Sequence, residues 1–141
     1  MFRSTGVIKY SPNMLGVVGQ SKQGRVSDKW WMVIECDPEI GRYLRHLHHL
    51  DRHRCDLLTR PSWKEHITVV RDEEPLQAFQ TLWKAYDGFT VEFLWDLTVH
   101  TNGEYYWIPV VCDFALRIRE ELGLTRNPYY PLHMSIGHNK V

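Results

Sequence analysis

The sequence lacks several features that would assign it to a familiar class. Its 141 residues include only three cysteines, Cys36, Cys55 and Cys112, an odd number without CxxC spacing. This argues against a disulfide framework or a zinc knuckle and favours a reducing compartment, so we expect a cytoplasmic protein. The longest strongly apolar run covers only residues 30–34, and no apolar signal core stands before Lys9. We therefore expect neither a membrane protein nor a secreted one.

The sequence also lacks an excess of charge and a phosphate-binding loop. Its 17 Lys and Arg balance 17 Asp and Glu, which argues against charge-driven binding of duplex DNA. Gly16, Gly19 and Gly24 do not have the spacing of a P-loop or a dinucleotide loop, and no GK[ST] follows them. The sequence therefore gives no support for an ATP- or NAD-dependent activity, and we expect no cofactor.

What is present is an ordinary globular composition with an uneven distribution of charge. Apolar residues make up 43% and charged residues 24% of the chain, which suits one domain with a sizeable core. Residues 42–71 carry seven bases and three acids, whereas residues 92–121 carry two bases and six acids. A neutral chain of this kind can still present a local site for an anion.

Apolar periodicity and turn residues divide the chain into alternating strands and helices. Bulky β-branched or aromatic runs predict buried strands, and apolar residues three and four apart predict helices. We expect strands over 6–10, 30–36, 63–71, 89–99, 104–111 and 129–137, and helices over 38–51, 75–88 and 113–122. Residues 11–27 are expected to form a loop, and Asn102-Gly103 is typical of a hairpin turn.

The two halves of the chain repeat one order of features. An aromatic pair leads through an apolar run to Cys-Asp and a predicted helix, first over residues 30–37 and again over residues 105–113. Each helix is followed by a predicted strand that carries a histidine. Two interpretations stay open, a coincidental likeness between two α/β units and a duplicated lobe with pseudo-twofold symmetry.

The two histidines stand in the same short motif, His-x-Thr/Ser. The motif reads His66-Ile-Thr68 in the first half and His133-Met-Ser135 in the second. Because strand side chains alternate between two faces, each motif directs an imidazole and a hydroxyl to one face and an apolar residue to the other. The bare motif is short, but both copies have apolar flanks and both follow a strand–helix unit.

With these two motifs the sequence resembles the 2H phosphoesterase superfamily, named for two His-x-Thr/Ser motifs that face each other across a cleft. The resemblance implies one α+β domain over 1–141, a bilobal duplicated unit whose mainly antiparallel sheets flank a central cleft, with lobes of roughly 1–71 and 72–141. It also implies metal-independent cleavage of a phosphodiester, such as a 2′,3′-cyclic phosphate, a 2′–5′ linkage or a cyclic nucleotide. The expected partner is a small nucleotide or an RNA end.

The chemistry of the motif residues suits cleavage of a phosphodiester independently of this resemblance. Histidine has an ordinary pKa of about 6.5, so one imidazole can accept the proton of the attacking oxygen while another protonates the leaving oxygen. The hydroxyls of Thr68 and Ser135 can donate to non-bridging phosphate oxygens. We therefore predict His66, Thr68, His133 and Ser135 as catalytic, and the assignment of acid and base stays open.

Four further residues are predicted to contact substrate. Lys64 shares strand parity with His66 and is the favoured neighbour of the phosphate. Arg71 follows the first motif, although its parity directs it with Ile67 unless the strand has ended. Tyr10 and Tyr130 could stack on a base.

Two rival interpretations remain for the sequence. His49 and His53 are four residues apart on or near a predicted helix, which would suit two metal ligands, but no HExxH motif accompanies them. This stretch is better explained as a solvated basic surface, and we expect no metal site. The other alternative is a non-catalytic module that binds RNA or a nucleotide in the same cleft.

Overall fold

Strands and helices follow the order that the apolar pattern predicts. The computed structural model describes residues 1–12, 29–51, 58–61 and 63–139. The predicted loop at 11–27, the three glycines of that loop, His53 and Cys55 lie largely or wholly outside these residues. Within them the elements are β1 (Phe2–Tyr10), β2 (Trp31–Cys36), α1 (Pro38–Asp51), β3 (His66–Arg71), the 3₁₀ helix η1 (Gln77–Leu82), β4 (Thr90–Trp95), β5 (His100–Thr101), β6 (Tyr105–Val111), α2 (Asp113–Glu121) and β7 (His133–His138).

The strands form one antiparallel sheet that closes on itself. Their order is β4-β1-β2-β3-β7-β6-β5, and β4 also pairs with β6 through Leu94–Val111 and Trp95–Val110. The predicted α+β class with a mainly antiparallel sheet is therefore confirmed. The sheet closes into a six-stranded barrel, however, which differs from the expected pair of lobes with separate sheets. The cause is strand β4, which pairs both with β1 at the N-terminus and with β6 of the second half of the chain.

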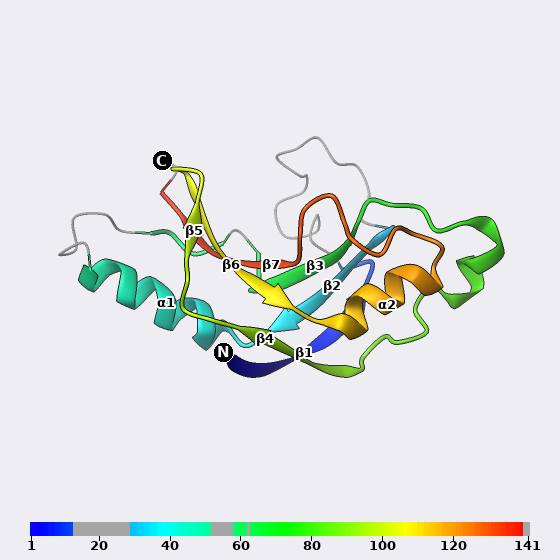
Figure 1. Ribbon diagram of the computed structural model, residues 1–141, viewed down its shortest axis with the longest axis horizontal. Coiled ribbons are helices and arrows are strands. Elements are labelled where there is room, and N and C mark those ends of the chain that lie inside the picture. Colours follow the sequence, from blue (N-terminus) through cyan, green and yellow to red (C-terminus); the bar gives the residue numbers. More distant parts are fainter. Residues whose placement is uncertain (13–28, 52–57, 62, 140–141) are drawn as a thin grey trace.

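One face of the sheet carries the core. Figure 1 shows α1 on the left and α2 on the right of the view, with β3 and β7 between them. Leu44 of α1 and Ile118 of α2 are buried in the same apolar cluster as the strands. Burying this cluster is the main favourable contribution to folding. Its strand members include Ile8, Met32, Ile34, Ile67, Val69, Phe93, Ile108, Met134 and Ile136.

Local signals in the sequence account for the ends of several elements. Oδ1 of Asp37 accepts a hydrogen bond from the backbone N–H of Glu39 at 3.0 Å, which caps the start of α1. Gly123 ends α2 with a φ of +77°, a conformation that favours glycine. Asn102 and Gly103 turn the chain between β5 and β6, as the hairpin signal predicts.

The predicted α-helix over 75–88 is wrong. This segment contains the 3₁₀ helix η1, and Trp83 at its end has an extended backbone with a ψ of 130°. Leu76, Phe79 and Leu82 are three residues apart, the period of a 3₁₀ helix, and all three side chains are exposed. Because these apolar side chains are not buried against the core, their spacing alone does not stabilise an α-helix in this segment.

None of the helices in the described residues is long and apolar enough to cross a membrane.

Candidate active site on strands β3 and β7

The two His-x-Thr/Ser motifs lie side by side on neighbouring strands. β3 and β7 are antiparallel, and Ile67 is paired with Met134. One step along this register in each direction sets His66 opposite Ser135 and Thr68 opposite His133. Ile67 and Met134 are fully buried, whereas the four polar side chains are only partly buried. The structure therefore brings all four predicted catalytic residues to one face of the sheet.

Each motif histidine makes the same backbone contact. Nδ1 of His66 lies 2.6 Å from the carbonyl oxygen of Lys64, and Nδ1 of His133 lies 2.8 Å from that of Pro131. A carbonyl oxygen only accepts hydrogen bonds, so Nδ1 carries a proton in both rings. In the neutral ring Nε2 then holds the lone pair that can accept a proton from a substrate.

Both motif histidines favour the neutral form. Burial lowers the pKa of His66 below its ordinary value of 6.5, and the charges of Arg71 and His133 act in the same direction. Burial also lowers the pKa of His133, and Arg71 again contributes. The hydrogen bond from each Nδ1 to a backbone carbonyl opposes these effects. Arg71 is thus close enough to influence both rings.

A tryptophan stands beside each histidine. The rings of Trp63 and His66 meet edge to face with centroids 4.9 Å apart, and those of Trp107 and His133 do so at 6.2 Å. Trp107 is also the cross-strand partner of Ser135. Trp63 was not among the residues predicted from the sequence; its place three residues before His66 is the signal that could have found it.

The predicted orientation of Arg71 is wrong because of a β-bulge. Met32 pairs with Val70 and Val33 pairs with Thr68, which leaves Val69 as an extra residue in β3. The extra residue reverses the side-chain alternation beyond it, so Arg71 lies on the face of His66 and Thr68. Its guanidinium lies 5.3 Å from the ring centroids of both Trp31 and Tyr130.

The structure brings two of the four predicted substrate-contacting residues, Arg71 and Tyr130, together, and it buries a third, Tyr10, in the core. Arg71 and Tyr130 are in contact beside the motifs, and Lys64 is exposed with its Nζ 3.8 Å from a carboxylate oxygen of Glu35. Tyr10 instead belongs to the core, with only 6% of its surface exposed, and its ring packs edge to face on Trp83. Burial raises the pKa of the Tyr10 hydroxyl to about 12. The ring of Tyr10 therefore has no exposed face on which a base could stack, and the prediction that Tyr10 contacts substrate is wrong.

A second β-bulge occupies the equivalent position in β7. Tyr106 pairs with Gly137 and Trp107 pairs with Ser135, so Ile136 is the extra residue. Val69 and Ile136 each directly follow the hydroxyl residue of their motif. Both strands therefore change their alternation at the same point of the motif.

An arginine side chain donates a hydrogen bond to the carbonyl of each bulge, and it is fully buried in the case of Arg119 and 13% exposed in the case of Arg45. Nη1 of Arg119 on α2 donates to the carbonyl oxygen of Val69 at 2.9 Å, and Nη1 of Arg45 on α1 donates to that of Ile136 at 2.7 Å. The helix of one strand–helix–strand segment thus braces the motif strand of the other. The positive charge of Arg45 is balanced by Glu65, whose Oε1 lies 3.3 Å from Nη1 of Arg45.

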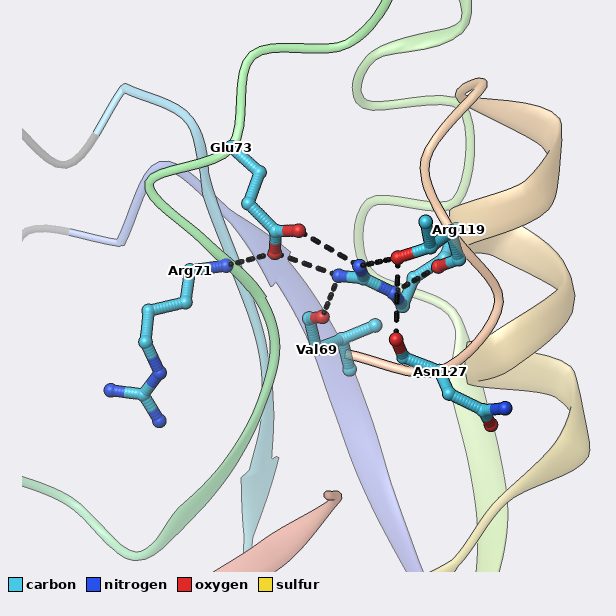
Figure 2. A network of polar contacts seen from close by, with 6 residues as sticks. Val69, Arg71, Glu73, Arg119 and Asn127 are labelled. Atoms are coloured by element: carbon cyan, nitrogen blue, oxygen red, sulfur yellow. Dashed lines mark hydrogen bonds and ion pairs between the residues drawn. The ribbon is translucent and has the colours of Figure 1, made fainter. Parts of the chain in front are cut away.

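The arginine on α2 also joins the bulge to Arg71, as Figure 2 shows. Nη1 and Nη2 of Arg119 donate to the two carboxylate oxygens of Glu73 at 2.7 and 2.8 Å, and Glu73 accepts the backbone N–H of Arg71 at 3.0 Å. Although burial acts to raise the pKa of Glu73, these hydrogen bonds hold it below its ordinary value. The side chain of Arg71 extends away from this network. The face of the sheet that carries the four side chains of the two motifs is called the motif face. The network therefore fixes the backbone from which the Arg71 side chain extends to the motif face.

The histidines of α1 do not form a metal site in the described residues. No group of three or more His, Cys, Asp or Glu side chains there is arranged to hold an ion. Nε2 of His49 accepts a hydrogen bond from the backbone N–H of Leu58 at 2.9 Å, and His53, its predicted partner, lies outside the described residues. Arg42 and His46 line a shallow basic hollow on the same helix.

Cys36, the last residue of β2, and Cys112, the residue after β6, are free, buried thiols. Burial raises the pKa of Cys36 to about 12 and that of Cys112 above its ordinary value. Such thiols are poor nucleophiles, so the chemistry of the described residues centres on the two motifs.

Comparison with protein-family models, with curated proteins and with solved structures finds no match for this chain.

Proposed function

We propose that this protein is a phosphodiesterase that cleaves a 2′,3′-cyclic, 2′–5′ or cyclic-nucleotide phosphodiester by general acid–base catalysis with two histidines. One observation carries the proposal. His66 and His133 lie on adjacent antiparallel strands, and each has its Nδ1 bound to a backbone carbonyl. Two Nε2 atoms are thereby available on one face, each with a hydroxyl residue beside it.

The proposed mechanism assigns one proton transfer to each histidine. Nε2 of the neutral ring accepts the proton of the attacking water or hydroxyl, and Nε2–H of the protonated ring gives its proton to the leaving oxygen. Thr68 and Ser135 donate hydrogen bonds to the non-bridging oxygens as negative charge builds on them. Which histidine acts as base depends on the direction in which the substrate lies. The residues named supply both proton transfers without a cofactor.

The charge around the motifs supports an anionic substrate. Arg71 lowers the pKa of both histidines, so its positive charge lies close enough to act on both rings. A bound phosphate would reverse this effect, because its negative charge stabilises the imidazolium form. Binding of substrate would thus prepare one histidine to act as the acid.

The repeated geometry also supports the duplicated unit. The segments β2-α1-β3 and β6-α2-β7 have the same order of elements. The Nδ1 contact, the bulge after the hydroxyl residue and the arginine brace occur once in each segment. We therefore propose that the two segments are copies related by a pseudo-twofold axis between β3 and β7. The two free buried thiols lead us to retain the cytoplasm as the proposed location.

Product analysis tests the proposal. The protein would be incubated with 2′,3′-cyclic mononucleotides, 2′–5′-linked oligonucleotides and cyclic di- and trinucleotides, each with and without EDTA. The expected result is a new phosphomonoester from at least one substrate, at the same rate with EDTA. Binding of a nucleotide without any product would instead support the non-catalytic module, and loss of activity with EDTA would contradict the metal-independent mechanism.

A further inference from the structure

The strand alternation beyond each bulge brings a second basic residue to the motif face. Arg71 lies three residues after Thr68, and His138 lies three residues after Ser135. The burial patterns of β3 and β7 agree at the first five positions, and the sixth residue of each strand, Arg71 or His138, is again outside the buried class. His138 pairs with Tyr105, which is two residues from Trp107, the partner of Ser135. His138 is therefore the positional counterpart of Arg71.

The aromatic neighbours extend the correspondence. Tyr130 lies three residues before His133 and Trp63 lies three residues before His66. Tyr130 contacts Arg71, Trp63 contacts His66, and the ring of His138 lies 6.1 Å from that of Tyr105. Each end of the paired motifs thus combines a basic side chain with an aromatic ring.

The ring of His138 is suited to donate a hydrogen bond. Its Nδ1 is buried and has no hydrogen-bond partner among the described residues. A buried N–H without an acceptor is rarer than an unsatisfied acceptor, so the proton of the neutral ring belongs on Nε2. This tautomer is opposite to that of His66 and His133. His138 therefore donates through Nε2, which suits binding of a phosphate or base oxygen.

The two basic residues lie at opposite ends of the site. Arg71 and His138 are each four residues from the Ile67–Met134 pair, in opposite directions along the antiparallel strands. At about 3.3 Å per residue, and allowing for the two bulges, their Cα atoms are roughly 20–25 Å apart. A substrate centred on the motifs must extend to both sides of the scissile phosphate to contact both residues.

We infer that His138 is a substrate-binding residue and that the substrate is an oligonucleotide, linear or cyclic, with nucleotides on both sides of the phosphodiester that is cut. This inference rests on the proposed function. Arg71 with Tyr130 binds one flank, and His138 with Tyr105 and Trp63 binds the other. A 2′,3′-cyclic mononucleotide needs the central motifs and one flank at most, and the flank of Arg71 and Tyr130 stays intact when His138 is replaced.

Two substrates and one variant test the inference. The variant is His138→Gln, which keeps a side-chain amide donor but loses the imidazole ring, and the matched control is His46→Gln, an exposed histidine of α1. KM and kcat would be measured for a 2′–5′-linked trinucleotide or cyclic dinucleotide, whichever the wild type cleaves faster, and for a 2′,3′-cyclic mononucleotide. We expect His138→Gln to raise KM for the oligonucleotide about tenfold and to leave the mononucleotide within about twofold. His46→Gln should change neither.

A measurement of binding distinguishes failure of this inference from failure of the proposed function. The Kd of the same oligonucleotides would be measured by calorimetry for the turnover-deficient variant His66→Asn, with and without His138→Gln. A weaker Kd with His138→Gln, together with no product from the wild type on any substrate, would support the binding site and refute the phosphodiesterase. If His138→Gln left KM and Kd for the oligonucleotides unchanged, the inference would be overturned. It would also be overturned if KM rose equally for the oligonucleotide and the mononucleotide. In both cases, turnover by the wild type would still support the proposed function.

Discussion

One backbone carbonyl sets the proton of each motif histidine. The contacts of His66 with Lys64 and of His133 with Pro131 both fix the Nδ1–H tautomer. The sequence could predict the identity and face of these two residues, because the alternation of a strand is regular up to the bulge. It could not predict the tautomer, which depends on a carbonyl two residues away and on the local bend of the chain.

Under the proposed mechanism, the lowered pKa values of His66 and His133 predict an acidic optimum of kcat/KM. Catalysis needs one neutral and one protonated histidine, and that state is lost as pH rises above both pKa values, which lie below 6.5. The pH profile of kcat/KM should therefore peak below pH 6.5 and fall towards pH 8. Stopped assays across pH 4.5–8.5, with controls for protein unfolding, would measure it. A peak at pH 7.5 or above would contradict the assignment.

A substitution of Arg71 tests the cause of the lowered pKa values through the same pH profile. Because its positive charge lowers the pKa of both rings, Arg71→Gln should shift the alkaline limb of kcat/KM to higher pH. Titration of the two imidazoles by NMR should show both pKa values rising. Unchanged pKa values in this variant would show that Arg71 does not face the motifs.

The two hydroxyls predict a defect confined to turnover. Thr68→Val and Ser135→Ala each remove one donor to the phosphate oxygens, and loss of such a donor costs about 10²–10³ in kcat. Steady-state kinetics on the best substrate of the panel would separate kcat from KM. A tenfold rise in KM with an unchanged kcat would assign these hydroxyls to ground-state binding instead.

At the scale of elements, the two bulges do most to shape the site. Strand boundaries and the hairpin were predictable from local residue types, because each depends on turn or cap residues within a few positions. The bulges at Val69 and Ile136 were not, since the alternation of polar and apolar residues in both motifs predicts a regular strand. Arg119 and Arg45, which hold the bulge carbonyls, lie far from them in sequence. The same non-local contacts explain the wrong orientation predicted for Arg71.

The brace on α2 predicts a large difference between two arginine variants. Arg119 is fully buried and bonds Val69, Glu73 and Thr125. Arg119→Leu leaves those acceptors unpaired and should lower the free energy of unfolding by about 3 kcal/mol. Arg126, which follows α2, makes only exposed ion pairs with Asp113 and Glu120 of that helix, so Arg126→Leu should cost about 0–1 kcal/mol. Urea unfolding would compare them, and equal effects would contradict the bracing role.

At the scale of the whole molecule, the closed sheet joins the two halves into one body. The pairing of β4 with both β1 and β6 could not be read from the sequence, because no local residue pattern identifies the partner of a strand. The repeated order of elements was readable and supports the duplication that we propose. Closure places the two motif strands, β3 and β7, side by side within one sheet that spans both halves.

The ion pair of Glu73 gives global stability a defined response to acid. Its folded pKa is lowered, so its contribution is complete above its ordinary value of 4.5 and is lost as pH falls through the folded value. Glu73→Gln should therefore be less stable than the wild type at pH 7, with a difference that shrinks below pH 4.5. Thermal unfolding at a series of pH values would follow it. A difference that grew in acid would have the wrong sign.

The most direct test of the two-histidine mechanism is the turnover of His66→Asn, His133→Asn and the double variant on the best substrate, with EDTA present. Each single variant should lose at least about 10³ in kcat and keep its fold by circular dichroism, and the double variant should lose little more, because residues that act as a unit are not additive. Full activity in either single variant would contradict the account.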